Sequence, residues 1–384
     1  MRQTADVVVV GGGAVGVSAA YHLADAGAGA VVLLERAERL GTGSTGACAG
    51  GFRHQFGSEV NVLLSIESIR MITRFAEEHG LPLDVARDGY LFLVKSEDMW
   101  ARFLSTVEMQ RSLGVEVEIL DAEEVAKLVP GLSVDRVVGA TFGPNDGIAD
   151  PAGLTEGYAT LARRAGVDIR TGVEATAVRT SNGRVAGVDT PAGPIAAPVV
   201  VNAAGPWARE LARTAGVEIP LEPIPRHILV TGSFPDAPTR RTLVVDVETS
   251  FYFHREGPGV LMGMGSPHER PTFDTSVDQR FVEEELLPTA VEVFPPLESA
   301  GVATAWCGLY EMTPDRHPVI GEAPGVRGLY LANGFSGHGF QHAPVVGKLL
   351  AEMIGEGKAT TVDVSPLGLQ RFSGDGVPIE THVI

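Results

Sequence analysis

The stretch Val7-Val8-Val9-Val10-Gly11-Gly12-Gly13-Ala14-Val15-Gly16 decides the fold of this chain. Four consecutive β-branched residues predict a short strand that is buried on both faces. The glycines that follow have the spacing G-x-G-x-x-G, at Gly11, Gly13 and Gly16. This pattern by itself is only weak evidence of a dinucleotide site, so its flanks have to agree with it.

The flanks do agree. A helix is predicted from about Ala14 to Ala26, and a second apolar strand follows from Ala30 to Leu34 and ends in Glu35. The acidic residue therefore falls about 20 residues beyond the glycines, as in a βαβ unit that binds a dinucleotide. An ordinary glycine-rich turn is the alternative, and the combined strand, helix and acid favour the dinucleotide.

Each residue of the pattern has its own physical reason. Gly11 permits a tight turn, Gly13 lets the backbone approach a pyrophosphate, and Gly16 lets the helix pack close to the strand. The helix N-terminus offers free N–H groups to phosphates. Glu35 is expected to bind a ribose, and its charge would repel a 2′-phosphate, which argues against an NADP-type ligand.

Composition narrows the class of protein. The 384 residues are enough for two domains, and 48 acidic against 30 basic residues give a net charge of −18. Such a charge disfavours nucleic-acid binding. Cys48 and Cys307 have no metal-ligand spacing, so we expect no metal site and a reducing, cytoplasmic location. No apolar run is long enough for a membrane span, and no signal peptide is expected.

Three further small-residue segments follow predicted elements. Residues 41–56 are rich in glycine and hydroxyl groups and then turn to Arg-His-Gln; they are expected to run past the pyrophosphate, with a flexible surface loop as the alternative. Residues 202–207 follow a strand at 198–201 and join the same crevice. Residues 333–344 follow a strand at 329–332 and open a helix whose positive end would face a reduced flavin ring. No second G-x-G-x-x-G occurs, so a separate nicotinamide site is not expected.

The remaining pattern predicts a second domain. Residues 58–79 are expected to form one amphipathic helix, and strands between 228 and 264 are expected to form an antiparallel sheet. We therefore expect an α/β fold with a Rossmann-like dinucleotide-binding domain and a second, substrate-binding domain on a largely antiparallel sheet flanked by helices. Strand alternation places Tyr252 and His254 on one face, where they line a pocket or edge a core.

With these motifs in order, the chain resembles the D-amino-acid-oxidase-like flavin amine oxidoreductases. It is most similar to the β-subunit of heterotetrameric sarcosine oxidase and its L-proline dehydrogenase and cyanide-forming glycine dehydrogenase relatives. Nearly the whole chain is covered by the resemblance, which is carried by the N-terminal glycines, Gly43-Ser44-Thr45 with Gly50-Gly51-Phe52-Arg53, Asn202 to Trp207, Leu309 to Asp315, and Gly334 to Gln341.

The resemblance implies FAD as cofactor and domains built from discontinuous segments. These are a Rossmann-like FAD-binding domain (1–82, 142–215 and 300–384) and a substrate-binding domain (83–141 and 216–299). The residues that match its cofactor contacts are Gly11, Gly13, Ala14, Val15, Gly16, Glu35, Arg36, Gly43, Ser44, Thr45, Gly50, Gly51, Val173, Ala203, Gly205, Trp207, Gly308, Leu309, Gly337, His338, Gly339, Phe340 and Gln341. Two positions depart from monomeric sarcosine oxidase. Gln341 replaces a lysine that grips the substrate carboxylate, and Cys307 lies one residue from the cysteine that carries flavin covalently, so we expect non-covalent FAD.

The resemblance implies oxidation of the C–N bond of a small amino acid or N-methyl amino acid of the sarcosine, proline or glycine type. The imine would form by hydride transfer to flavin N5, with oxygen or partner subunits taking the electrons. A flavin subunit that passes electrons to partners, or the same fold acting on a D-amino acid or a 2-hydroxy acid, are the alternatives. Candidate groups for holding the substrate are Arg53, His54, Tyr252, His254 and Gln341.

Overall fold

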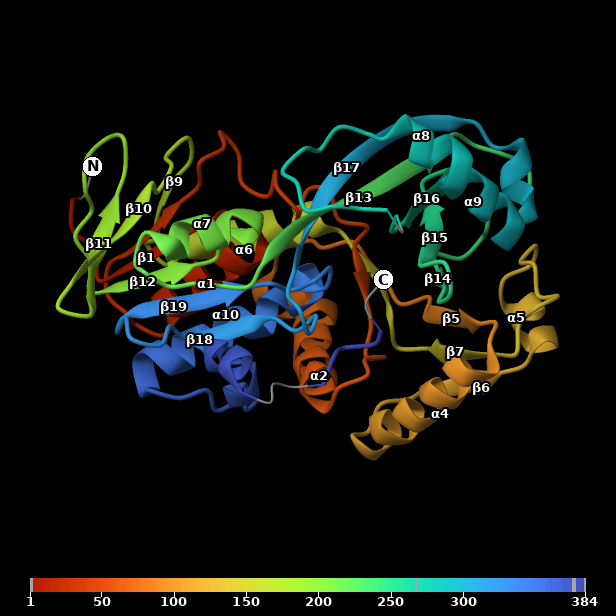
Figure 1. Cartoon of the computed structure of the whole chain (residues 1–384), viewed down its shortest axis with the longest axis horizontal. Coiled ribbons are helices and arrows are strands. Elements are labelled where there is room, and N and C mark those ends of the chain that lie inside the picture. The colour runs from red at the N-terminus through yellow and green to blue at the C-terminus, as the bar shows by residue number, and fades with distance from the viewer. Residues whose placement is uncertain (1–2, 267, 375–377, 383–384) are drawn as a thin grey trace.

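The computed structural model describes residues 3–266, 268–374 and 378–382. Two large sheets lie at opposite ends of the molecule, and the chain passes between them several times (Figure 1). Helix α2 (Glu59–Thr73) and the C-terminal residues lie between the two ends. The arrangement is the predicted α/β fold with a second, largely antiparallel sheet, and this prediction is confirmed.

The first sheet has six strands in the order β18-β19-β12-β1-β2-β9. All neighbours are parallel except β18 and β19. The strand formed by the four valines, β1 (Val7–Val10), lies in its interior and pairs on both sides. The other strands are β2 (Val31–Leu34), β9 (Asp168–Arg170), β12 (Val199–Asn202), β18 (Val319–Glu322) and β19 (Leu329–Asn333).

Strand β1 is buried on both faces because two layers cover it. Val7 and Val9 belong to a core shared with three helices, α1 (Ala14–Asp25), α6 (Pro151–Arg164) and α10 (Gly339–Glu356). Val8 and Val10 face a second core, formed with the hairpin of β10 (Ala177–Ser181) and β11 (Arg184–Asp189) and with α7 (Ala208–Arg213). The uninterrupted run of valines follows from this double cover.

The second sheet has eight strands in the order β17-β13-β16-β15-β14-β5-β7-β6. Every pair is antiparallel except β14 and β5, which run parallel. Its strands are β5 (Tyr90–Val94), β6 (Glu118–Leu120), β7 (Gly139–Gly143), β13 (Glu222–Thr231), β14 (Leu243–Asp246), β15 (Phe251–Glu256), β16 (Gly259–Met264) and β17 (Val302–Met312).

Short elements complete both ends. A small sheet joins β3 (Gly51–Phe52), β8 (Gly147–Ala149) and β4 (Val85–Ala86) in that order. The remaining helical segments are α3 (Phe75–His79), α4 (Glu97–Ser112), α5 (Ala122–Leu128), η1 (Gly205–Trp207), α8 (Gln279–Phe281), η2 (Val282–Leu286), α9 (Leu287–Val293), η3 (Pro295–Ser299), η4 (Ser365–Leu367) and η5 (Leu369–Ser373).

One helix and two strands differ from the bounds expected from the sequence. The single helix expected over residues 58–79 is wrong, because α2 ends at Thr73 and α3 begins only at Phe75. The division into two discontinuous domains stays a prediction. Strands β7 and β17 both belong to the eight-stranded sheet of the substrate end. The predicted bounds put most of β7 in the substrate domain, but they put residues 142–143 of β7 and all of β17 in the FAD-binding domain.

The C-terminal residues 378–382 connect the two ends of the molecule. The Glu380 carboxylate is fully buried and accepts hydrogen bonds from Gly57 N (2.7 Å), Ser58 Oγ (2.8 Å) and Asn61 Nδ2 (2.9 Å) at the start of α2. The His382 ring lies 4.3 Å from the ring of Phe103 in α4. The side chains of Glu380 and His382 therefore anchor this segment in the interior.

Among the residues that the structure describes, no helix is long and apolar enough to cross a membrane.

The turn after β1 leaves no room for side chains at two of its glycines. Gly11 has φ of +112°, and a Cβ there would lie 2.1 Å from Ala203 O. A Cβ on Gly16 would lie 1.9 Å from Gly11 O. Both contacts are with backbone, so neither can be relieved by a side-chain rotation.

We expect Gly16→Ala to destabilise the protein by about 1–3 kcal/mol, because the added methyl group must push α1 away from the turn. Thermal unfolding should show this as a melting temperature lower by several degrees. Gly355→Ala, at an exposed position of α10 where a Cβ meets nothing within 4 Å, is the matched control and should be neutral or stabilising. Equal melting temperatures for the two variants would contradict the packing argument.

Candidate functional site

A cavity of about 760 Å³ runs from the carboxyl ends of β1, β2 and β12 to the face of the eight-stranded sheet. Its volume lies within the range of cofactor and ligand sites. The carboxyl ends of parallel strands are where open α/β sheets bind ligands. The position of the cavity thus follows from the fold.

Glu35 stands at one end of this cavity, together with Arg36 and Val173. Its two carboxylate oxygens accept hydrogen bonds from Gly12 N and Ala37 N, each at 2.7 Å. Each oxygen keeps a free lone pair, so the carboxylate is fixed in place and still able to accept from a ribose hydroxyl.

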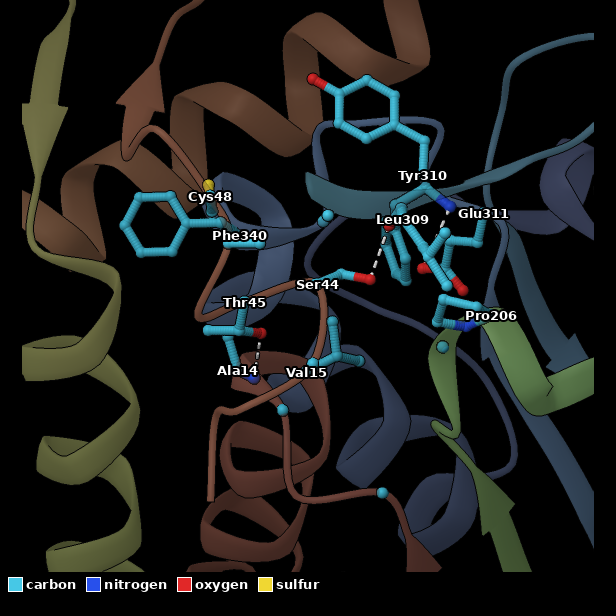
Figure 2. Close-up of a pocket in the computed structure, with 18 of the residues that line it drawn as sticks. Ala14, Val15, Ser44, Thr45, Cys48, Pro206, Leu309, Tyr310, Glu311 and Phe340 are labelled. Carbon is cyan, nitrogen blue, oxygen red and sulfur yellow. Dashed lines mark hydrogen bonds between the residues drawn. The ribbon is translucent and has the colours of Figure 1, made fainter. Parts of the chain in front are cut away.

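The middle of the cavity is formed by backbone. Helix α1 begins at Ala14, and Gly13 before it has no side chain to cap the first turn. Figure 2 shows two hydroxyl groups that hold the neighbouring loop: Thr45 Oγ1 accepts from Ala14 N (3.1 Å), and Ser44 Oγ donates to Leu309 O (2.7 Å). Bare N–H groups at a helix N-terminus are a suitable site for a pyrophosphate.

The far end of the cavity is aromatic. Tyr90, Tyr252 and Tyr310 line it from β5, β15 and β17, together with Arg226 from β13. Burial raises the pKa of all three phenol groups. The hydroxyl groups consequently stay protonated at neutral pH and can donate hydrogen bonds to an anion.

All but two of the residues predicted to contact the cofactor line the cavity, and their contact with FAD itself stays a prediction. Gly16 and Gly50 do not line the cavity. Gly16 instead packs on the turn, and Gly50, with φ of +78°, lies against Ala149 O. Both glycines shape the walls from behind, and their expected contact with the cofactor is corrected to this supporting role.

Two of the five substrate candidates also lie elsewhere. His54 Nδ1 is 2.6 Å from the buried Asp146 Oδ1 and lines a different, smaller cavity with Arg70 and Arg87. Both ring nitrogens of the buried His254 lie against carbonyl oxygens, those of Arg255 (2.8 Å) and Ala49 (3.0 Å). Neither histidine lines the large cavity, so the expectation that they face the substrate is corrected.

Arg53, Tyr252 and Gln341 do line the cavity. The Arg53 guanidinium, however, donates to the carbonyl oxygens of Gln55 and His382 and lies over the Phe56 ring at 3.9 Å. The Gln341 side chain accepts from Arg53 N (3.0 Å) and donates to Arg53 O (3.2 Å). Gln341 therefore holds the Arg53 backbone, and its role toward a substrate stays a prediction.

Several wall residues were not among the predicted site residues: Tyr90, Arg226, Tyr310 and Glu311. Arg226 could have been found from the sequence. It lies between Ile224 and Ile228 on the same face of a strand and so interrupts an apolar face. Glu311 had none in the sequence. Its Oε1 accepts from Phe335 N, a residue 24 positions away, and its Oε2 is buried without a hydrogen-bond partner in the described residues.

Comparison with known proteins agrees with this geometry. The family model described as DAO, FAD dependent oxidoreductase, matches residues 6–353. The chain belongs to this family. It is 33% identical to mitochondrial sarcosine dehydrogenase of Mus musculus, over 97% of this chain and 42% of that protein. The chain thus spans less than half the length of that relative.

Solved structures of the DAO family superpose well on the chain. L-Proline dehydrogenase from P. horikoshii has a TM-score of 0.91 at 32% identity and covers 98% of this chain and 100% of its own. Glycine oxidase from Geobacillus kaustophilus has a TM-score of 0.85 at 27% identity and covers 96% and 99%. The resemblance to flavin amine oxidoreductases drawn from the sequence motifs is confirmed.

The residues present fit FAD, the cofactor of the DAO family. Glu35 would hold the ribose, the remaining N–H groups at the start of α1 would hold the pyrophosphate, and the loop before α10 would lie near the ring. When bound, FAD supplies the two-electron acceptor that the amino acids of this chain lack. Cys307 lines the cavity beside Gly308, and its expected lack of a covalent bond to flavin stays a prediction.

We expect Glu35→Ala to weaken FAD binding at least tenfold, because it removes a charged acceptor and frees two backbone donors, a loss of about 1.5–3 kcal/mol. Quenching of flavin fluorescence on titration of the apoprotein gives the dissociation constant. Glu38→Ala, an exposed acid nearby that does not line the cavity, is the control. If both variants bound FAD like the wild type, the ribose role of Glu35 would be excluded.

Glu311 makes the stability of the FAD-free protein dependent on pH. Burial raises its pKa from 4.5 to about 7, against the opposing effect of the Gly334 and Phe335 N–H groups. A group with a raised carboxyl pKa binds its proton more tightly in the folded state, so stability falls as the pH rises from about 4.5 to about 7. The Glu311→Gln side chain cannot ionise. The melting temperature of this variant should therefore rise relative to that of the wild type between about pH 4.5 and about pH 7, and should remain higher above pH 7.

Melting curves of both proteins between pH 4.5 and pH 8 test this expectation, with an advantage of about 1–3 kcal/mol at the alkaline end. The exposed Glu298→Gln is the control and should track the wild type. A constant difference between Glu311→Gln and the wild type at every pH would contradict the assignment.

Proposed function

We propose that this chain oxidises the C–N bond of a small amino acid or N-methyl amino acid, of the sarcosine, proline or glycine type, to the imine. The observation that carries the proposal is the end of the cavity beyond the flavin-binding segments, where the buried Tyr90 and Tyr252, the half-buried Tyr310 and Arg226 line the wall. The hydroxyl and guanidinium groups of this wall can bind a carboxylate, and its aromatic rings can contact a small apolar side chain.

The relatives support the same substrate class. These relatives are sarcosine dehydrogenase, L-proline dehydrogenase and glycine oxidase, all named for small amino acids. The chain spans 42% of the sarcosine dehydrogenase. L-Proline dehydrogenase matches along its full length and supports the proposal more directly.

The chain's own groups would bind, orient and shield the substrate. The tyrosine hydroxyl groups remain protonated and donate to the carboxylate, while the rings of Tyr90 and Tyr252 restrict the side chain. Burial lowers the pKa of His338 and of His342, the latter to about 3, so the start of α10 carries no imidazolium. Stabilisation of negative charge on a reduced ring would then come from the positive end of the helix itself.

We propose that the electrons pass either to oxygen or to a partner subunit. If the isolated chain does not turn over with oxygen, the second alternative applies, in which the chain is the flavin subunit of a complex. The cytoplasmic location is likewise a proposal, supported by two cysteines that are both free.

Anaerobic addition of sarcosine, L-proline, glycine and D-alanine in turn to the FAD-loaded protein tests the proposal. We expect one of the first three to bleach the visible flavin band, because hydride transfer reduces the ring. Turnover under air, compared with turnover with an artificial acceptor, then separates an oxidase from a subunit that needs partners.

Bleaching by D-alanine alone would assign the activity to a D-amino acid. Bleaching only by a 2-hydroxy acid, added in the same way, would assign the activity to that class of substrate. A flavin band that no amino acid bleaches would refute the proposed activity. Tyr252→Phe is a useful companion, since loss of one hydroxyl donor should raise KM for the amino acid about tenfold.

A further inference from the structure

Arg226 is the charged group best placed among the tyrosines of the cavity. It lies on β13 opposite Gly308 of β17, and its guanidinium carbon is 4.8 Å from the centre of the Tyr310 ring. The side chain is 8% exposed and lines the cavity. Its Nε is buried without a hydrogen-bond partner in the described part of the chain, which leaves a charged donor unsatisfied.

The acid that pairs with Arg226 comes from a loop over the cavity. Residues 268–278 follow β16, and Glu269 of this loop accepts a hydrogen bond from Arg226 Nη1. The same loop contributes Phe273 and Thr275 to the cavity wall. Phe273 stacks on Trp207 at 5.6 Å, and Thr272 N donates to Pro223 O (2.9 Å), so the loop is laid across the cavity by contacts on both sides.

Glu269 does not line the cavity, whereas Arg226 does. The loop carboxylate therefore holds the guanidinium from outside the cavity wall, while the guanidinium lies over the Tyr310 ring. Burial raises the pKa of Glu269 despite the arginine, which indicates that its ionised form is held at a cost. A second carboxylate brought to the same guanidinium would compete with it for charge.

We propose that Arg226 binds the carboxylate of the substrate and that Glu269 is the competing carboxylate that occupies Arg226 when no substrate is present. Binding of a small carboxylate would loosen the Arg226–Glu269 pair, and the loop residues 268–278 would sense an occupied site. This inference deepens the proposed function and rests on it, because an amino-acid substrate supplies the carboxylate.

Arg53 is the rival for this role. Arg53 is 5% exposed, and its guanidinium already donates to two backbone carbonyl groups, those of Gln55 and His382. Arg226 also donates to a backbone carbonyl, that of Pro225 (3.1 Å), but it is paired with a carboxylate, that of Glu269. A substrate carboxylate can replace another carboxylate, and this favours Arg226.

The test is a binding titration that needs no turnover. The FAD-loaded protein is titrated with acetate, the smallest carboxylate, and with acetamide as the uncharged counterpart, and the change in the flavin spectrum gives each dissociation constant. Glu269→Gln should tighten acetate binding about three- to tenfold and leave acetamide unchanged. Glu283→Gln removes an exposed charge beyond the same loop and should change neither.

Arg226→Met should weaken acetate binding at least tenfold. In the Arg226→Met background, Glu269→Gln should have no further effect, since the two residues act through one contact. Arg226→Lys keeps the charge and serves if the methionine variant does not fold.

The inference is overturned if Glu269→Gln leaves acetate binding unchanged, if its effect persists without Arg226, or if acetate does not bind the wild type. Failure of the proposed function would look different: acetate would bind as expected, while none of the amino acids would bleach the flavin.

Discussion

The contact between the turn after β1 and the strand end of β12 is the constraint on which the rest depends. Gly11 touches Ala203 O through a backbone conformation that only glycine adopts readily, and Gly16 touches Gly11 O. These two approaches fix where α1 begins relative to the sheet. Because Thr45 then binds Ala14 N, the position of α1 also fixes the hydroxyl-rich loop that leads to the substrate end.

Much of the fold could be predicted because its signals are local. The valine run, the glycine spacing and the acid after β2 lie within 30 residues, and each has a direct physical meaning. The antiparallel character of the second sheet followed from strand alternation. The parallel pairing of β14 with β5 could not be predicted, since it joins strands about 150 residues apart and leaves no local trace.

The substrate end was harder to predict for a related reason. Polar side chains there come from β5, β13, β15 and β17, and a strand pattern tells which face a residue takes but not what covers that face. His254 shares the face of Tyr252, yet Ala49 O covers it. The positions of His54 and Arg53 depend on Asp146 and on the C-terminal residues, which no motif connects to them.

Charge at this end is governed by local pairs. With a net charge of −18, the chain as a whole repels a carboxylate, so binding depends on a few donors in a buried setting where their field is weakly screened. Arg53, whose guanidinium is held by backbone carbonyl groups, and Arg226, which is paired with a loop carboxylate, differ in what they offer a ligand. The first is a fixed part of the wall, and the second can exchange partners.

The insertion of residues 378–382 between α2 and α4 has a consequence for synthesis of the protein. Glu380 and His382 leave the ribosome after every other part of the site, and until then the start of α2 and the Arg53 guanidinium lack their partners. The first sheet has all its strands by Asn333 and its last covering helix, α10, by Glu356, so it can assemble earlier. A growing chain would thus acquire its cofactor cradle first, and its substrate wall is complete only after His382 has been added.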